Sequence, residues 1–171
     1  MLVDIQEKLI PVIQNRDQVL ANAERLLHGA ECFEIPVTLS EQYPKGLGPT
    51  DPTLLATNNS QLEVLEKTTF SCREMFPRFE GLKNEGRDQI LIAGIEAHIC
   101  VLQSAIDLAT SGFQVFLVAD AVGSRAAANR ELAIDRCSHS GVIPVSTESI
   151  LFEWCETSQN KHFKAISKLV R

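Results

Sequence analysis

Basic charge is scarce in this sequence, and long apolar runs are missing. The 171 residues include 16 Lys and Arg against 22 Asp and Glu, which gives a formal net charge of −6. A protein that binds nucleic acid generally presents a basic surface to the phosphates, so we expect no nucleic-acid partner. A membrane-spanning helix needs about 20 consecutive apolar residues, so we expect no membrane association. A small anionic substrate is compatible with this charge, because the local field of a pocket can oppose the global sign.

Cysteines are few, and their pattern argues against the usual cysteine-rich architectures. The five cysteines are Cys32, Cys72, Cys100, Cys137 and Cys155. An odd number without any CxxC pair argues against a disulfide framework or a zinc finger and favours a reducing compartment, so we expect a cytoplasmic protein. The N-terminus has no basic segment leading into an apolar stretch, as a signal peptide would. Met1 opens directly into an expected strand, however, so a missing lead-in or an upstream targeting signal would not be visible in this sequence.

Cofactor motifs are also missing. No G-x-G-x-x-G follows the first expected strand and no G-x-x-x-x-G-K-[ST] is present, which argues against a nucleotide-dependent enzyme. The four histidines, His28, His98, His139 and His162, do not have the spacing of metal ligands. We therefore expect neither a catalytic metal nor another cofactor.

Apolar periodicity alternates between strands and helices along the chain. The expected strands are Leu2–Asp4, Pro36–Leu39, Val64–Phe70 near a sheet edge, Gln89–Ile95, Gln114–Ala119 and Gly141–Val145. The expected helices are Arg16–Phe33, residues 102–109, Arg125–His139, Ile150–Cys155 and His162–Val170, with a loop over Glu41–Pro52. The sequence thus predicts an α/β fold in one domain over residues 1–171. Its three layers would be a doubly wound, mostly parallel sheet of about six strands with helices on both faces, as in Rossmann-like folds.

Three chemically useful side chains lie within or after the later part of expected strands. Ligands and substrates of such folds bind at the carboxyl ends of the strands, where Asp4, Lys67 and Cys100 would share one rim. These are the groups of a nucleophilic hydrolase, in which a thiolate attacks, a cation lowers the thiol pKa and a carboxylate moves the proton. Cys100 also opens a helix, whose N-terminal amides favour a thiolate and can hold an oxyanion.

Structural interpretations of the same residues stay open. Asp4 would then cap the following segment, and Lys67 would be a surface lysine. A free cysteine is most often a small buried hydrophobe. We expect that role for Cys32, Cys137 and Cys155. Cys72 is either structural or a second reactive thiol, and Asp120 and Arg125 are expected to pair or to cap the turn after the fifth strand.

Several short motifs occur together in one order. They are LVDIQ around Asp4, EQYPKGLG after the second expected strand, EKTTFSC around Lys67, GIEAHIC at Cys100 and DAVGSR after the fifth expected strand. Their order and intervals resemble those of the isochorismatase-like cysteine hydrolases from Leu2 to about Ser149. The EQYPKGLG segment is similar to the metal-free branch, which includes the isochorismatase domain-containing proteins.

This resemblance implies a role for each residue of the trio. Cys100 would attack a carbonyl or related carbon, Asp4 would take the thiol proton and return it to the leaving group, and Lys67 would stabilise the thiolate and orient Asp4. Members carry a non-proline cis peptide, which here falls at Ile95–Glu96, and the amides of Glu96 and Cys100 would form the oxyanion hole. Members also commonly assemble, so we expect a homo-oligomer, either a dimer or a tetramer.

Six further residues are candidates for the substrate pocket. They are Gln6, Gln42, Tyr43, Phe70, Ala97 and His98. Gln6 is expected to support the site by hydrogen bonding, and Tyr43 and Phe70 are expected to form a pocket wall or to pack in the core. His98 would contact the site or a partner subunit rather than act as a base.

The sequence also departs from related patterns. Nicotinamidases of the superfamily carry an Asp-x-His…His metal site after the second strand, whereas residues 39–48 contain no histidine, so nicotinamide is disfavoured as the substrate. Arg73 stands where an aromatic residue is expected, which affects specificity more than mechanism.

The predicted function is a metal-independent hydrolase of a small amide or related C–N substrate, acting through a thioester-type intermediate. Two alternatives from other classes are a catalytically silent binding or scaffold protein and a redox-sensing thiol protein in which Cys72 resolves oxidised Cys100.

Overall fold

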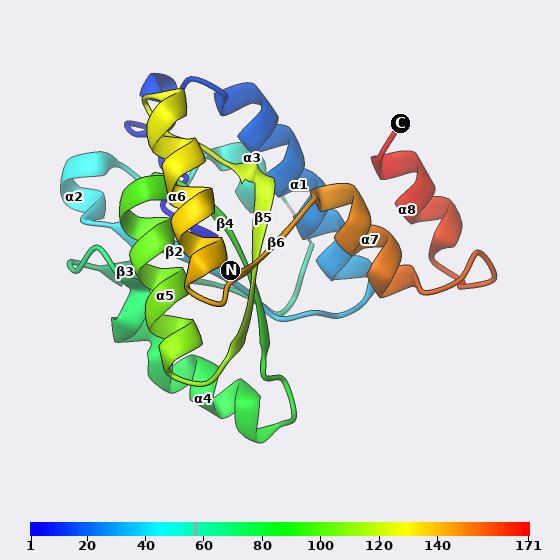
Figure 1. Ribbon diagram of the computed structural model, residues 1–171. Helices are drawn as coiled ribbons and strands as arrows, with labels where there is room; N and C mark the ends of the chain where they lie inside the picture. The colour runs from blue at the N-terminus through cyan, green and yellow to red at the C-terminus, as the bar shows by residue number, and fades with distance from the viewer. Residues whose placement is uncertain (57) are drawn as a thin grey trace.

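Six parallel strands form one sheet in the order β3-β2-β1-β4-β5-β6 (Figure 1). They are β1 (Leu2–Val3), β2 (Val37–Gln42), β3 (Leu62–Lys67), β4 (Gln89–Gly94), β5 (Gln114–Val122) and β6 (Ile143–Val145). The computed structural model describes residues 1–56 and 58–171. This strand order reverses direction between β1 and β4, which is the position where doubly wound sheets bind their ligands. The predicted fold class is confirmed, with β3 at a sheet edge as expected.

The helices and single helical turns connect the strands. They are η1 (Ile10–Val12), α1 (Arg16–Cys32), α2 (Pro44–Leu47), α3 (Pro52–Leu55), η2 (Cys72–Met75), α4 (Phe76–Asn84), the π-helical turn η3 (Ala97–Val101), α5 (Leu102–Thr110), α6 (Ala127–His139), α7 (Thr147–Cys155) and α8 (Phe163–Leu169). Within the described residues, no helix is both long enough and apolar enough to cross a membrane.

Helices cover both faces of the sheet, as predicted. Figure 1 shows α5 and α6 side by side on one face, and α1 beside α7 on the other. Each face has its own apolar core. The first includes Val101 of η3 and Ala105 and Leu108 of α5, with Ala133 and Cys137 of α6. The second includes Val19, Ala23 and Leu26 of α1 with Ile150 of α7. Both apolar cores pack against β1 and β4, the strands that precede Asp4 and Cys100.

Several predicted boundaries were wrong. Strand β2 continues to Gln42 rather than ending at Leu39, and residues 44–47 of the predicted loop form the short helix α2. The polar run Ser-Glu-Gln does not look like a strand in sequence, but parallel pairing with β3 holds it extended as far as Gln42 opposite Lys67. Helix α4 was missed altogether, because Pro77 and Gly81 interrupt the helical pattern.

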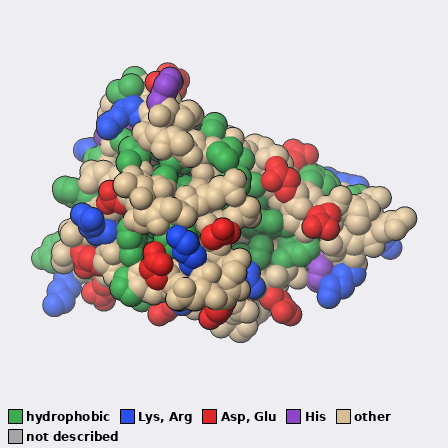
Figure 2. All heavy atoms as spheres, turned by 60° about the horizontal axis from the view of Figure 1, so that its bottom comes forward, with side chains coloured by type: hydrophobic (Ala, Val, Ile, Leu, Met, Phe, Trp, Pro, Cys, Tyr) green, Lys and Arg blue, Asp and Glu red, His purple; other side chains and the backbone are tan. Residues whose placement is uncertain are grey.

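The first strand is unusually short for its central place in the sheet. It has 2 residues, whereas its neighbours β2 and β4 have 6 each. The Met1 amine is buried and donates a hydrogen bond to the Leu91 carbonyl at 2.8 Å. Beneath it lies a cavity of about 400 Å³, lined by the first residues of β2 and β4 and by apolar side chains from both faces. Figure 2 turns the lower end of Figure 1 forward and shows hydrophobic side chains between charged ones there. This cavity lies at the amino ends of the strands, away from the candidate trio.

Candidate active site

Asp4 directly follows β1 and lies at the centre of the candidate site. Its side chain is wholly buried, and its backbone φ of 51° turns the chain sharply at the end of the strand. Its amide donates to the Ser40 carbonyl at 3.1 Å and to Ser40 Oγ at 3.2 Å, and Ser40 Oγ donates to Asp4 Oδ1 at 2.7 Å. The end of β2 therefore fixes both the backbone and the carboxylate of Asp4.

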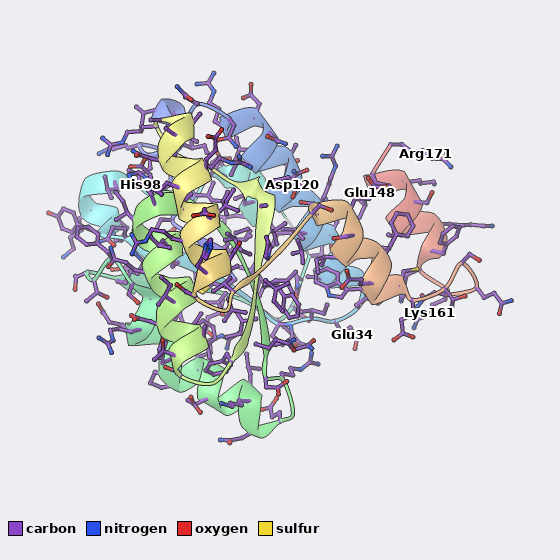
Figure 3. All side chains as sticks on the ribbon, in the orientation of Figure 1. Glu34, His98, Asp120, Glu148, Lys161 and Arg171 are labelled. Atoms are coloured by element: carbon purple, nitrogen blue, oxygen red, sulfur yellow. The ribbon has the colours of Figure 1, made fainter. Side chains whose placement is uncertain are left out.

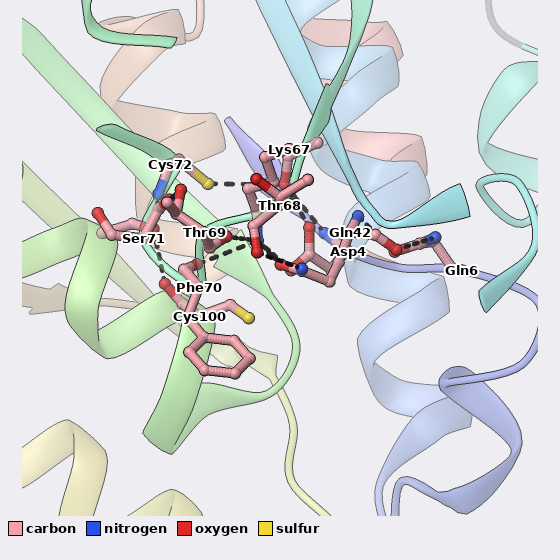
Figure 4. Close-up of polar contacts among 12 residues, drawn as sticks. Asp4, Gln6, Gln42, Lys67, Thr68, Thr69, Phe70, Ser71, Cys72 and Cys100 are labelled. Atoms are coloured by element: carbon pink, nitrogen blue, oxygen red, sulfur yellow. Dashed lines mark hydrogen bonds and ion pairs between the residues drawn. The ribbon is translucent and has the colours of Figure 1, made fainter. Parts of the chain in front are cut away.

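Lys67, the last residue of β3, forms a buried ion pair with Asp4. The distance from Lys67 Nζ to Asp4 Oδ2 is 2.8 Å, and neither side chain is exposed. The ammonium also donates to Gln42 Oε1 at 2.7 Å, the Phe70 carbonyl at 3.0 Å and the Thr69 carbonyl at 3.2 Å (Figure 4). An ammonium group in a dry site needs such acceptors. Lys67 is therefore a residue of the interior, not a surface lysine.

Cys100 lies on η3, against the same carboxylate. It is 7% exposed, and its thiol is close enough to the Asp4 carboxyl for each group to shift the pKa of the other. Burial, followed by the Asp4 charge, raises the pKa of the Cys100 thiol well above its usual range, although Lys67 opposes this shift. The expectation of a lowered thiol pKa was therefore wrong. The Lys67 ammonium is present, but it pairs directly with Asp4. Burial removes water from the Cys100 thiol, which disfavours its thiolate form. Cys100 is therefore a thiol beside a carboxylate.

The pKa of Asp4 is also raised. Burial is the main cause, and it is opposed first by the Lys67 charge and then by hydrogen bonds from Lys67, Ser40 and Cys100. A desolvated carboxylate is a stronger base than an exposed one. The Asp4 carboxylate beside the Cys100 thiol thus has a raised proton affinity.

The turn between β4 and Cys100 is held in a defined shape. The Ile95–Glu96 peptide bond is cis, as the resemblance implied. The Ala97 amide donates to the Gly123 carbonyl at 2.7 Å, and the amides of Ile99 and Val101 donate to the Glu96 carbonyl. These three amides are therefore not available to a ligand. The oxyanion hole predicted from the amides of Glu96 and Cys100 stays a prediction.

Gln6 is buried, and its side chain bonds to the backbone beside the site. Its Nε2 donates to the carbonyls of Gly48 and Gln42 at 2.6 and 3.1 Å, and its Oε1 accepts from the Gln42 amide at 2.8 Å. The side chain of Gln42 in turn reaches Lys67 Nζ and donates to the Thr68 carbonyl at 2.9 Å. The two glutamines thus connect the ends of β1, β2 and β3.

The remaining pocket candidates lie around this core. Tyr43 and Phe70 are exposed, at 57% and 58%, and Ala97 is buried. The His98 ring contacts Ser124 Oγ at 3.1 Å and Asn129 at 3.4 Å, so it lies toward α6 (Figure 3). Tyr43 and Phe70 therefore do not pack in the core.

Asp120 and Arg125 have separate partners. Asp120 Oδ1 accepts from the Thr147 amide and hydroxyl at 2.8 and 2.9 Å, at the start of α7. Arg125 instead pairs with Glu96, with 2.9 Å between Nε and Oε1. Their expected mutual pairing is therefore not found. Asp120 thus binds the first residue of α7, whereas Arg125 holds the Glu96 side chain in the turn before Cys100.

Sequence reasoning missed two hydroxyl residues of the site. Ser40 contacts Asp4, and Ser104 Oγ donates to the Cys100 carbonyl at 2.6 Å and accepts from the Cys72 amide at 2.9 Å. Ser40 lies opposite Val3 in the β1–β2 register. Recognising β2 as a strand through Ser40 would have placed its side chain at the rim.

Comparison with known proteins gives the family. The family described as Isochorismatase domain matches residues 1–149. The chain belongs to the isochorismatase family. Isochorismatase domain-containing protein 2 of Danio rerio is 40% identical over 171 residues, covering 99% of this chain and 85% of the relative.

Solved structures of the isochorismatase fold agree closely. The structure described as MAR1 ribonuclease from Caenorhabditis elegans has a TM-score of 0.93 and 34% identity, covering 99% of this chain and 86% of that one. The ycaC gene product of Escherichia coli, described as an octameric hydrolase of unknown specificity, has a TM-score of 0.88 and 26% identity, covering 98% and 83%. Family and fold are thereby confirmed.

A metal is not expected at this site. Over residues 1–56 and 58–171, no group of three His, Cys, Asp or Glu side chains could hold a metal ion. The absence of a catalytic metal nevertheless stays a prediction.

Proposed function

We propose that this member of the isochorismatase family is a metal-independent hydrolase that cleaves a small amide or related C–N substrate through a thioester on Cys100. The observation that carries the proposal is the placement of the buried Cys100 thiol beside Asp4, whose Oδ2 is 2.8 Å from Lys67 Nζ. Nucleophile, base and orienting cation come from three strand ends, in the arrangement that covalent catalysis needs.

In the proposed acylation, Cys100 Sγ bonds to the substrate carbonyl carbon while its proton moves to Asp4. The carbonyl oxygen becomes an oxyanion, which the amides of Glu96 and Cys100 hold. The C–N bond then breaks, the nitrogen leaves with the proton from Asp4, and the carbonyl re-forms as a thioester. In deacylation, water gives a proton to Asp4 and attacks the thioester, and Asp4 returns that proton to the Cys100 sulfur as the acid leaves.

The raised pKa of the thiol decides the timing of proton transfer. Because burial and Asp4 disfavour a free thiolate, the proton leaves as the carbon–sulfur bond forms. General-base catalysis by Asp4 therefore replaces a thiolate formed in advance. Lys67 keeps Asp4 ionised and holds it in one orientation.

The pocket and the assembly are also part of this proposal. Gln42, Tyr43, Phe70, Ala97 and His98 would line the entrance, with Gln6 supporting them. The exposed rings of Tyr43 and Phe70 suit contact with the substrate or with a second copy of the chain in a homodimer or tetramer.

A substrate screen coupled to intact-protein mass spectrometry tests the proposal. Wild type is incubated with a panel of small amides, and release of amine and a mass increase on the protein are followed. Cys100→Ala should abolish both, and Asp4→Asn should reduce turnover about 10²-fold or more. The matched control is Cys137→Ala, which removes a buried cysteine of α6 and should leave both unchanged.

Two other outcomes would replace the proposed amide hydrolase with a different function. A disulfide between Cys72 and Cys100 under mild peroxide, without any amide turnover, would favour the redox-sensing alternative. The name of the C. elegans relative makes RNA a necessary comparison substrate. Cleavage of an RNA oligonucleotide that Cys100→Ala abolishes would replace the amide proposal with a nuclease.

A further inference from the structure

The three hydrogen-bond partners of Ser40 Oγ leave only one direction for its hydroxyl proton. Its oxygen is 3.2 Å from the Asp4 amide, which donates to it, and 3.7 Å from Cys72 Sγ, whose thiol also donates to it. A hydroxyl has two acceptor lone pairs and one proton. With both lone pairs occupied, the proton is left for Asp4 Oδ1 at 2.7 Å.

The two oxygens of Asp4 are thereby held from opposite sides. Oδ1 accepts from Ser40 on β2, and Oδ2 accepts from Lys67 on β3. The titratable groups that act on this carboxyl are Lys67, Cys100 on η3 and, through Ser40, Cys72 on η2. Among these groups, Cys72 alone has no part in the proposed chemistry, yet its side chain is wholly buried beside the site.

We propose that Ser40 is a positioning residue for Asp4, and that the Cys72 thiol fixes the direction of the Ser40 hydroxyl. The relay runs from Cys72 through Ser40 to the base. It deepens the proposed function, because it holds the Asp4 carboxylate in one orientation beside Cys100. Cys72 then acts as a hydrogen-bond donor and not as a second nucleophile.

The relay also sets the proton affinity of Asp4. A hydrogen bond to the charged form of a carboxyl lowers its pKa, and the Ser40 hydroxyl acts in this direction. Loss of the hydroxyl should therefore raise the pKa of Asp4 and move the acid limb of the kcat/KM profile to higher pH. At neutral pH, kcat/KM should fall about tenfold, as expected for one hydrogen bond to a charged group.

The experiment compares Ser40→Ala with two matched variants. Ser40→Thr keeps the hydroxyl. Thr38→Val removes a buried hydroxyl from the same face of β2, where Thr38 accepts a hydrogen bond from Arg78. The Asp4 carboxyl is titrated by NMR in protein labelled with ¹³C-aspartate, and Asp4→Asn assigns the signal. We expect a raised Asp4 pKa in Ser40→Ala only. An unchanged titration, or the same change in Thr38→Val, would overturn the proposal.

A second pair of variants tests the thiol and covers the case in which Ser40→Ala does not fold. Cys72→Ser keeps a donor, and Cys72→Ala removes it. Only Cys72→Ala should raise the Asp4 pKa, and equal titrations of the two variants would remove Cys72 from the relay. The titration needs no substrate. Absence of turnover in wild type would therefore contradict the hydrolase proposal, whereas an unchanged Asp4 signal in an active enzyme would contradict the relay alone.

Discussion

Gln6 and Gln42 are joined by two hydrogen bonds across the ends of β1 and β2. Gln6 Oε1 accepts from the Gln42 amide at 2.8 Å, and Gln6 Nε2 donates to the Gln42 carbonyl at 3.1 Å. A side-chain amide thus replaces the backbone partner that Gln42 would have in a longer β1. This clamp keeps the Lys67-binding side chain of Gln42 in place.

Replacement of Gln6 by Ala should therefore destabilise the protein. It leaves the Gln42 amide and the Gly48 carbonyl without their partner, so the free energy of unfolding should fall by about 2–3 kcal/mol in urea denaturation. Gln89→Ala is the control, because Gln89 lies in an exposed hydrogen bond to Gln114 and should cost about 0.5 kcal/mol or less. Equal losses in the two variants would argue against the clamp.

Removal of one charge of the buried ion pair should cost more than removal of both. Lys67→Met leaves the Asp4 carboxylate buried and unpaired, which should lower the free energy of unfolding by about 3–5 kcal/mol. The double variant Asp4→Asn/Lys67→Met leaves no buried charge without a partner. Part of the lost free energy of unfolding should therefore be recovered. Urea denaturation of the single and double variants measures the coupling.

The exposed pair of Arg16 and Asp17 serves as the reference for this comparison. Its side chains are 52% and 91% exposed, so Arg16→Met should change stability by about 0.5 kcal/mol or less. If Lys67→Met were equally mild, the buried pair would not hold the ends of β1 and β3 together.

The main lines of the site could be predicted from the sequence because topology brings strand ends together. Asp4 follows β1, Lys67 ends β3 and Cys100 lies in the turn after β4, and a parallel sheet places such residues on one rim. Their contacts then follow from the strand order, since β1 lies between β2 and β4.

Other features depend on burial and register, which single-sequence patterns do not contain. The place of Ser40 at the site depends on the register of β1 and β2, which sets Val3 opposite Ser40. The raised pKa of Cys100 follows from desolvation, whereas the sequence indicated only a cation and a helix start. Helix α4 was hidden by Pro77 and Gly81 within its own span.

For the 171-residue chain with a free amine at Met1, stability should rise with pH because that amine is buried. Burial lowers the pKa of this amine from 8.0 to about 5. Between these values the unfolded chain binds more protons than the folded one, so the free energy of unfolding increases as pH rises from about 5 to 8. The largest contribution of this group is on the order of 4 kcal/mol.

Urea denaturation at several pH values measures the slope. Nα-acetylated protein is the matched control, since it has no amine to titrate and should lose this part of the pH dependence. Identical slopes for the free and acetylated proteins would show that the amine does not control stability in this range.

Gly94, the last residue of β4, should not tolerate a side chain. Its φ is 120°, and an added Cβ would lie 2.2 Å from the Val3 carbonyl oxygen. Backbone atoms of a central strand cannot move aside, so Gly94→Ala should lower the free energy of unfolding by about 3 kcal/mol or more. Displacement of Val3 would also carry Asp4 away from Cys100, so amide turnover should fall even where the variant remains folded.

The matched substitution for Gly94→Ala is Gly81→Ala in α4, where nothing lies within 4 Å of an added Cβ. A helical glycine replaced by alanine loses less backbone entropy on folding, so this variant should gain about 0.5–1 kcal/mol and keep wild-type turnover. Opposite signs for the two variants in thermal unfolding would locate the constraint in the contact between β1 and β4. A stable, active Gly94→Ala protein would mean that β1 can shift without moving Asp4, and the rigid placement of the base would have to be abandoned.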